Sequence, residues 1–300
     1  MTLNRRHFVS LAGLAVLAGC SSSDPLSSDP SSSGPAGALV VGSQAYYSNE
    51  IIAELYAQSL EKLGLSVTRQ YNIGQREVYL PEIQSGKIDV FPEYNGNLLQ
   101  YLDKESTAAD TASIQAALTA ALGDGLRVLD PADASDQDSY TVTRAFADQH
   151  GLVSIADLTK VGGTIKIAAN SEFSARPYGP AGLKETYGVD AEVVPVEDSG
   201  GPLTVKALLD GDVQVADIYT ADPVIAKEDL VVLEDPQNLI LPQNVVPVVS
   251  SKVDEAAAEA IAKVNAALSA TELQKLNARS VDEKLGSDQV ARDWLAEQGL

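Results

Sequence analysis

Short runs of β-branched and aliphatic residues alternate with segments of helical periodicity along most of the chain. The pattern predicts strands at 39–41, 65–69, 88–91, 164–169, 192–196, 213–219 and 245–250. Helical patterns lie between most of these strands, and after the last one they fill the chain at 256–268, 271–281 and 288–298. This alternation is typical of an α/β fold with mostly parallel strands. The helix predicted at 51–63 has Ser48 as its expected N-cap and Gly64 as its expected end.

One internal similarity relates two of the predicted strands. Gly86 precedes a buried run that reaches Tyr94, and Gly211 precedes a similar run that reaches Tyr219, so each glycine stands eight residues before a tyrosine. Open α/β sheets bind ligands at the carboxyl ends of their strands. We therefore expect two similar units that face each other and hold Tyr94 and Tyr219 across one cleft; the alternative is two common helix-strand units whose tyrosines coincide by chance.

The first 38 residues differ from the rest of the chain. A basic segment with Arg5 and Arg6 precedes ten mostly apolar residues, 9–18, which are too short to cross a bilayer of about 30 Å, so 1–19 is read as a signal peptide. Its end, Leu17-Ala18-Gly19-Cys20, resembles the lipobox of bacterial-type lipoproteins, which implies lipidation of Cys20; the alternative is an ordinary signal peptide. The arginine pair with Phe8 and Val9 resembles a twin-arginine export signal. Residues 20–38 are then the lipidated cysteine and a Ser/Pro/Gly-rich flexible tether.

Charge and composition exclude several classes of function. The chain has 42 acidic and 21 basic residues, a net charge of −21, and loss of Arg5 and Arg6 with the leader makes it more negative still. Such a chain repels phosphate backbones and anionic headgroups, so we expect neither nucleic-acid binding nor a polybasic membrane contact. Cys20 is the only cysteine, and His150 is the only histidine outside the leader.

The sequence also lacks the motifs of common enzyme classes. It has no Gly-x-Ser-x-Gly elbow, no His-Glu-x-x-His and no phosphate loop, and His150 lies in a polar turn, so a secreted enzyme is the weaker hypothesis. Asp133, Asp136 and Asp138 lack the glycine and terminal glutamate of an EF-hand loop. We expect no cofactor and no metal.

Ordered segments over the whole region from residue 39 resemble the substrate-binding proteins of ABC transporters for glycine betaine, choline, carnitine and related quaternary amines. The segments that match are 41–43, 48–60, 86–96, 138–140, 171–177, 182–188, 208–219 and 247–249. The resemblance implies a two-lobed periplasmic-binding-protein fold of type II, with two crossings acting as a hinge. Lobe 1 would comprise 39–141 plus 246–300, and lobe 2 would comprise 142–245.

A quaternary ammonium has no N–H to donate, so a protein holds it by aromatic ring faces and distributed negative charge. By resemblance, three tyrosines match a cage, Asp138 matches an acid beside it, Arg176 matches the residue that meets a ligand carboxylate, and three further residues complete the site. The expected ligand-binding residues are Tyr94, Asn97, Asp138, Tyr140, Phe173, Arg176, Tyr219 and Gln44. Asp138 could instead lie in a solvated acidic loop, and Arg176 could instead make a structural ion pair.

The chain departs from the family at three places. Val205 occupies the place of a further cage tyrosine, Gln44 stands where lysine is usual, and Thr220 to Val224 replaces a polar run. The expected function is an exported receptor, a monomer anchored by Cys20 to the outer face of the cytoplasmic membrane, that passes a small quaternary amine to an ABC permease. The alternative is a receptor or sensor of the same fold for another small solute, such as an amino acid.

Overall fold

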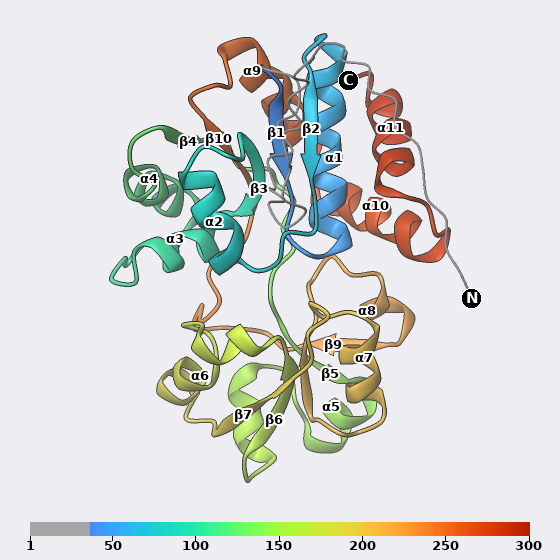
Figure 1. Cartoon of the computed structure of the whole chain (residues 1–300). Helices are drawn as coiled ribbons and strands as arrows, with labels where there is room; N and C mark the ends of the chain where they lie inside the picture. The colour runs from blue at the N-terminus through green and yellow to red at the C-terminus, as the bar shows by residue number, and fades with distance from the viewer. Residues whose placement is uncertain (1–36) are drawn as a thin grey trace, which may run out of the picture. The chain divides into compact units, whose positions relative to one another are not determined.

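Ten strands form two five-stranded sheets in the part of the chain that the structure describes, residues 37–300 (Figure 1). The structure is a computed structural model. The expected signal peptide, Cys20 and nearly all of the predicted tether lie outside the described residues.

The first sheet has the order β2-β1-β3-β10-β4. Its strands are β1 (Leu39–Gly42), β2 (Val67–Gln70), β3 (Val90–Tyr94), β4 (Leu126–Val128) and β10 (Val245–Ser250). Strand β1 runs parallel to β2 and β3, whereas β10 runs antiparallel to β3 and β4. The strand that returns from the second sheet is therefore inserted into the first.

The second sheet has the equivalent order, β7-β6-β8-β5-β9. Its strands are β5 (Tyr140–Thr143), β6 (Ile165–Ala169), β7 (Ala191–Pro195), β8 (Val215–Asp217) and β9 (Leu230–Val232). Strand β6 is parallel to β7 and β8, and β5 is antiparallel to β8 and β9. Strands β3 and β8 occupy the same place in the two sheets, which confirms that the Gly86 and Gly211 segments belong to similar units.

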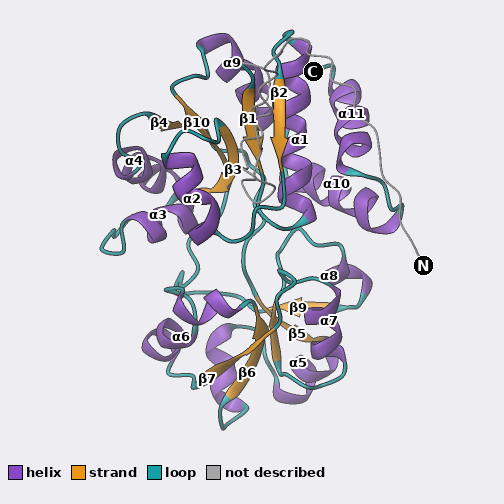
Figure 2. Ribbon diagram, viewed as in Figure 1, coloured by secondary structure: helices purple, strands orange, loops and turns teal. Residues whose placement is uncertain are grey.

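Helices cover both faces of the first sheet (Figure 2). On one face α1 (Tyr47–Lys62) packs against α9 (Glu255–Ala267), α10 (Ala270–Asp282) and α11 (Ser287–Gln298). On the other face lie α2 (Arg76–Gln84), α3 (Asn95–Leu102) and α4 (Thr111–Ala121). Alternate residues of β3 supply the two cores, Val90 and Tyr94 to one and Phe91 to the other, as the two-residue period of a strand requires.

The second sheet also has helices on both faces, but they are shorter. They are α5 (Arg144–His150), α6 (Pro180–Tyr187), α7 (Pro202–Leu209), α8 (Val224–Lys227) and the 3-10 helices η1 (Ile155–Lys160) and η2 (Ser171–Ala175). One core gathers around β6, η1 and α6, and the other around β8 and α7. No helix within 37–300 is long and apolar enough to cross a membrane.

Two details differ from the expectations. Ser48 does not cap α1, because the N-cap is Tyr46, two residues earlier, and Ser48 is buried in the first turn, where it accepts a hydrogen bond from Asn277. The expected boundary between 141 and 142 falls inside β5, which pairs along its length with second-sheet strands. The crossing segment continues directly into a strand of β-branched residues, so the sequence pattern does not mark where one lobe ends.

The two connections between the sheets, 129–139 and 233–244, run alongside each other. The Val245 amide donates to the Ala134 carbonyl (3.0 Å), and the Ser135 hydroxyl donates to the Gln243 carbonyl (2.9 Å). The Asp138 amide donates to the side-chain oxygen of Gln243 (3.1 Å). Residues of both connections are thereby fixed beside the strand ends where the candidate site lies.

Candidate functional site

The carboxyl ends of β1, β3, β6 and β8 are followed by polar and aromatic side chains that line one pocket, as expected for an open α/β sheet. The residues come from both sheets and from both connections. They are Gln44, Tyr46, Gln75, Arg76, Tyr94, Asn97, Asp136, Asp138, Glu172, Arg176, Tyr178, Tyr219 and Gln243. We call this site the polar pocket.

Six of the eight expected ligand-binding residues line the polar pocket: Gln44, Tyr94, Asn97, Asp138, Arg176 and Tyr219. Tyr94 and Tyr219, from equivalent strands of the two sheets, therefore face one cavity.

The structure does not bring Tyr140 and Phe173 to the pocket wall. Tyr140 is 1% exposed and Phe173 is 3% exposed, and both lie in the core of the second lobe, where their rings meet edge to face at 6.0 Å. The Tyr140 hydroxyl donates to the Tyr178 carbonyl (2.6 Å). Tyr140 begins β5, and the alternation of that strand turns its ring into the core. Its visible role is to support the segment that carries Tyr178.

Of the four tyrosines that line the pocket, Tyr46, Tyr94 and Tyr219 form one cluster. The Tyr46 ring lies edge to face on Tyr219 with 5.0 Å between centroids, and the Tyr46 hydroxyl donates to the Tyr94 hydroxyl. Burial raises the pKa of all three phenols, so each stays neutral at physiological pH. Neutral phenol rings with negative faces are the groups that attract an organic cation.

Carboxyl groups lie next to these rings. Burial raises the pKa of Asp136 to about 7, although the Ala221 amide donates to its carboxyl (3.0 Å). The Asp138 carboxyl accepts from the Asn97 amide (2.8 Å) and from the Tyr178 hydroxyl (3.0 Å). Burial, and then the neighbouring charge of Asp138, raise the pKa of Asp217 well above its usual range. Asp136 and Asp138 of the acidic loop are thus buried in the site, whereas Asp133 is exposed.

Arg76 lines the pocket, but its positive charge is neutralised by Glu93, a residue that does not line the pocket. Its guanidinium makes two hydrogen bonds to the Glu93 carboxylate, at 2.8 and 2.9 Å, and the Tyr79 hydroxyl donates to the same carboxylate (2.7 Å). Glu93 is fully buried and Arg76 is 4% exposed. A bidentate pair of this kind is rigid, because both partners would be uncompensated buried charges if separated.

Arg176 was expected either to meet a ligand carboxylate or to form a structural ion pair, and the structure shows an ion pair. Its Nη1 donates to the Glu77 carboxylate on α2 (3.0 Å), which links the second lobe to the first. Arg176 nevertheless still lines the polar pocket.

Three side-chain amide atoms at the pocket have no hydrogen-bonding partner in the described part of the protein. They are the Nε2 atoms of Gln44 and Gln243 and the Oδ1 atom of Asn97. Gln44 is 7% exposed and Gln243 1% exposed. Because leaving a buried polar group unpaired costs about 1–3 kcal/mol, these groups are suited to a polar ligand or to water.

Sequence reasoning missed several lining residues, above all Tyr46, Asp136 and Tyr178. Tyr46 follows the predicted strand at 39–41, so the strand-end rule that selected Tyr94 and Tyr219 would have selected it too. Tyr178 follows directly on the matched segment 171–177, but no periodicity indicated that its hydroxyl turns back to Asp138.

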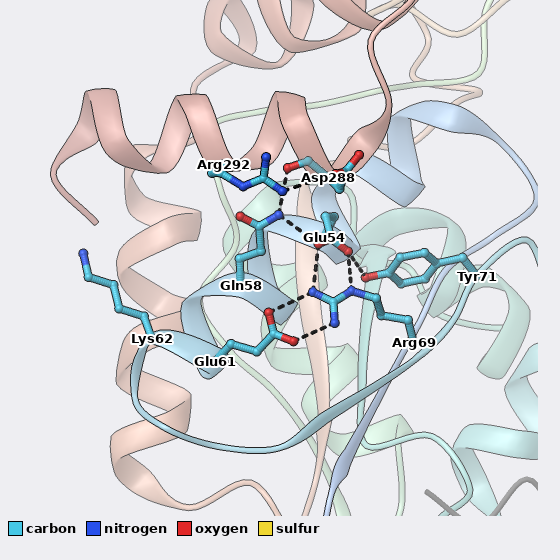
Figure 3. Close-up of a pocket in the computed structure, with 8 residues that line it drawn as sticks. All are labelled: Glu54, Gln58, Glu61, Lys62, Arg69, Tyr71, Asp288 and Arg292. Carbon is cyan, nitrogen blue, oxygen red and sulfur yellow. Dashed lines mark hydrogen bonds and ion pairs between the residues drawn. The ribbon is translucent and has the colours of Figure 1, made fainter.

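The polar pocket has a free volume of about 30 Å³, which is small but enough for water. A larger, shallow depression of about 570 Å³ lies between α1, β2 and α11 (Figure 3). There Arg69 pairs with both Glu54 and Glu61, and Arg292 pairs with Asp288. The opposite charges in this depression therefore neutralise one another.

Within 37–300 no group of three or more His, Cys, Asp or Glu is placed to hold a metal ion.

Two sheets of equivalent order, joined by paired connections and meeting at a polar pocket, define a two-lobed solute-binding protein. Residues 37–297 match the family model described as the substrate binding domain of ABC-type glycine betaine transport systems, and the chain belongs to that family. The family consists of transport substrate-binding proteins, which is not an enzyme class.

Two relatives of the chain are named as glycine betaine-binding proteins. The chain is 29% identical to the glycine betaine-binding protein YehZ of Escherichia coli (strain K12), over 88% of this chain and 92% of the relative. It is 26% identical to a glycine-betaine-binding protein of Pseudomonas aeruginosa, over 88% and 89%.

Solved structures share the fold. Apo YehZ from Escherichia coli matches with a TM-score of 0.62 and 28% identity over 87% of this chain and 99% of that chain. A glycine betaine/carnitine/choline ABC transporter structure matches with a TM-score of 0.71 and 22% identity over 87% and 98%. The expected two-lobed α/β fold of type II is confirmed.

Proposed function

We propose that this protein captures a quaternary-amine solute of the glycine betaine, choline or carnitine type in the polar pocket and delivers it to an ABC permease. The observation that carries the proposal is the convergence of Tyr46, Tyr94 and Tyr219 on one cavity beside Asp136 and Asp138. The relatives named for glycine betaine support it. No bond is made or broken; the action is binding and closure of the two lobes.

Aromatic rings, carboxyl groups and hydrogen-bond donors contribute differently to ligand binding in this site. Each aromatic ring contributes roughly 0.5–2 kcal/mol to holding a cation, whereas a micromolar complex needs about 8 kcal/mol. The three rings therefore do not suffice, and the carboxyl groups supply further attraction. For a zwitterion, Arg176 and the unpartnered amides of Gln44 and Gln243 are the donors for the ligand carboxylate. Asn97 orients Asp138, and Tyr140 and Phe173 support the wall from the core.

We also propose that the protein is exported, that residues 1–19 are removed and that Cys20 is lipidated. Residues 20–38 would tether the receptor, as a monomer, to the outer face of the cytoplasmic membrane. Export by the twin-arginine route follows from Arg5 and Arg6. Fatty-acid labelling that persists in Cys20→Ser, or wild-type protein recovered in the soluble fraction, would contradict the anchor.

The ligand is tested by titration calorimetry of the purified protein with glycine betaine, choline, carnitine, proline betaine and unmethylated amino acids. We expect at least one quaternary amine to bind with a sub-millimolar dissociation constant. Binding of an amino acid alone would replace the proposal by the alternative of a same-fold receptor for another solute. Tyr219→Ala is the site variant, and Tyr101→Ala, on α3 outside the polar pocket, is the matched control.

A further inference from the structure

A second, larger cavity lies beside the polar pocket and is mostly apolar. It has a volume of about 520 Å³ and lies between the segment after β1, α7 with the loop before it, and α10. Its apolar walls are Tyr46, Tyr47, Val205, Leu209, Val224 and Val281. We call it the Tyr46–Val205 cleft. A volume in this range, with few polar groups, is typical of a small-molecule site.

One side chain separates the two cavities. Tyr46 lines both the polar pocket and the Tyr46–Val205 cleft. Its hydroxyl is held by Tyr94 and its ring rests on the edge of Tyr219, both on the polar side. Tyr46 is thus shared by the two cavities, with the free volume of the cleft on one side of it.

The sizes of the two cavities show why the position of Tyr46 matters. The free volume of the polar pocket is about 30 Å³, far less than that of the cleft. A small displacement of Tyr46 that breaks its hydrogen bond to Tyr94 would join that pocket to a cavity of about 520 Å³. A ligand with its cationic head at Tyr94 and Tyr219 would then extend any substituent into the cleft.

The shape of the cleft is built into the backbone on its α7 side. Gly200 has φ +75°, and a Cβ there would lie 2.9 Å from the Asp217 carbonyl, so only glycine lets this loop approach β8 so closely. Asp198 then caps α7 by accepting from the Leu203 amide and the Thr204 hydroxyl. The cleft is therefore a structured feature of the loop and not a surface irregularity.

The charges of the cleft restrict its occupant. Asp198, Asp210 and Asp222 lie on its rim, and the nearby Lys206 is paired with Asp210. Asp222 accepts from the Tyr47 hydroxyl (2.9 Å) and so keeps its carboxylate at the rim. Net negative charge repels an anionic arm and favours a cationic ligand with a neutral apolar arm.

We propose that the Tyr46–Val205 cleft is the second compartment of the ligand site and takes the neutral alkyl or aryl arm of a substituted quaternary ammonium ion. The inference rests on the proposed function and specifies its substrate class. The physiological solute is then larger and more apolar than a compact trimethylammonium zwitterion.

The test is calorimetry with tetramethylammonium, butyltrimethylammonium and hexyltrimethylammonium. If the arm enters the cleft, affinity rises about threefold to fourfold for each added methylene. Val205→Tyr fills the cleft, so the ratio of hexyl to tetramethyl affinity should fall toward one. Leu203→Tyr, on the same helix but 64% exposed and outside the cleft, should keep the wild-type ratio.

Leu209→Ser provides a second variant, because Leu209 lines the cleft and is 46% exposed, which makes its replacement tolerable for folding. It should lower hexyl affinity severalfold more than tetramethyl affinity. Binding of tetramethylammonium or choline with no chain-length dependence would overturn the second compartment and leave the proposed function standing. Failure of every quaternary ammonium ion to bind would overturn the proposed function, and this inference with it.

Discussion

Arg176 on the second lobe and Glu77 on the first form an ion pair of 3.0 Å. The Arg176 side chain is 13% exposed and that of Glu77 is 47% exposed. The same guanidinium also lines the pocket. Glu77 is therefore positioned to compete with a ligand carboxylate for Arg176.

Glu77→Gln should change which ligand is preferred. With its competitor removed, Arg176 is free to pair with a carboxylate, so the affinity ratio of glycine betaine to choline should rise about threefold to tenfold. Calorimetry with both ligands measures the ratio, and Glu82→Gln, which is on the same helix but paired with Lys87, is the control. An unchanged ratio would remove Arg176 from the carboxylate-binding role.

Tyr219 and Tyr140 should respond differently to mutation. Tyr219→Ala removes a wall of the polar pocket and should weaken quaternary-amine binding by about 1–2 kcal/mol. Tyr140→Phe removes only the buried hydrogen bond to the Tyr178 carbonyl, so it should cost about 1 kcal/mol of unfolding free energy with affinity nearly unchanged. Calorimetry and urea unfolding separate the two effects; a large loss of affinity in Tyr140→Phe would place that hydroxyl in the binding site.

Asp136 should make stability depend on pH. Burial raises the pKa of its carboxyl from an ordinary 3.8 to about 7, so the folded state keeps a proton that the unfolded chain releases. The stabilisation is fully present below about pH 4 and is lost as the pH rises toward 7, a change of up to roughly 4 kcal/mol.

Asp136→Asn cannot ionise, so its stability relative to the wild type should rise between pH 4 and 7. Urea unfolding at several pH values measures the difference, with Asp133→Asn in the exposed part of the same loop as the control. A difference that does not vary with pH would show that Asp136 is charged throughout. If a bound cation favours the ionised carboxylate, binding near pH 6 should also release a proton, detectable by calorimetry in buffers of different ionisation enthalpy.

The buried pair of Arg76 and Glu93 should matter more for stability than the exposed pairs do. Glu93→Gln leaves the Arg76 charge without its partner and should cost about 3–5 kcal/mol. Glu61→Gln, which breaks a pair with the partly exposed Arg69, should cost about 1 kcal/mol or less. Equal losses in urea unfolding would mean that the pocket admits enough water to solvate Arg76.

Much of the fold could be predicted from the local pattern. Strand β10 was predicted at its observed ends, and the helices after it within about a residue, because each has strong periodicity and clear ends. The prediction of a cap at Ser48 was wrong, and the predicted lobe boundary falls inside β5; both features depend on contacts with residues distant in sequence. The rule that ligands bind at the carboxyl ends of strands predicts that Tyr94 and Tyr219 share a cavity. Tyr46, which follows β1, obeys the same rule.

The sequence by itself determined the α/β class, the two similar units, and the family resemblance that the family model confirms, because periodicity and motif order are local properties of the chain. Only the tertiary structure decided which side chains share a cavity. Tyr140 turns into the core because of the alternation of β5, whereas Tyr46 becomes the wall between two cavities because the loop after β1 meets residues almost 160 positions away, at Val205. Side-chain direction and long-range proximity are set by packing, and packing is fixed only when the whole chain has folded.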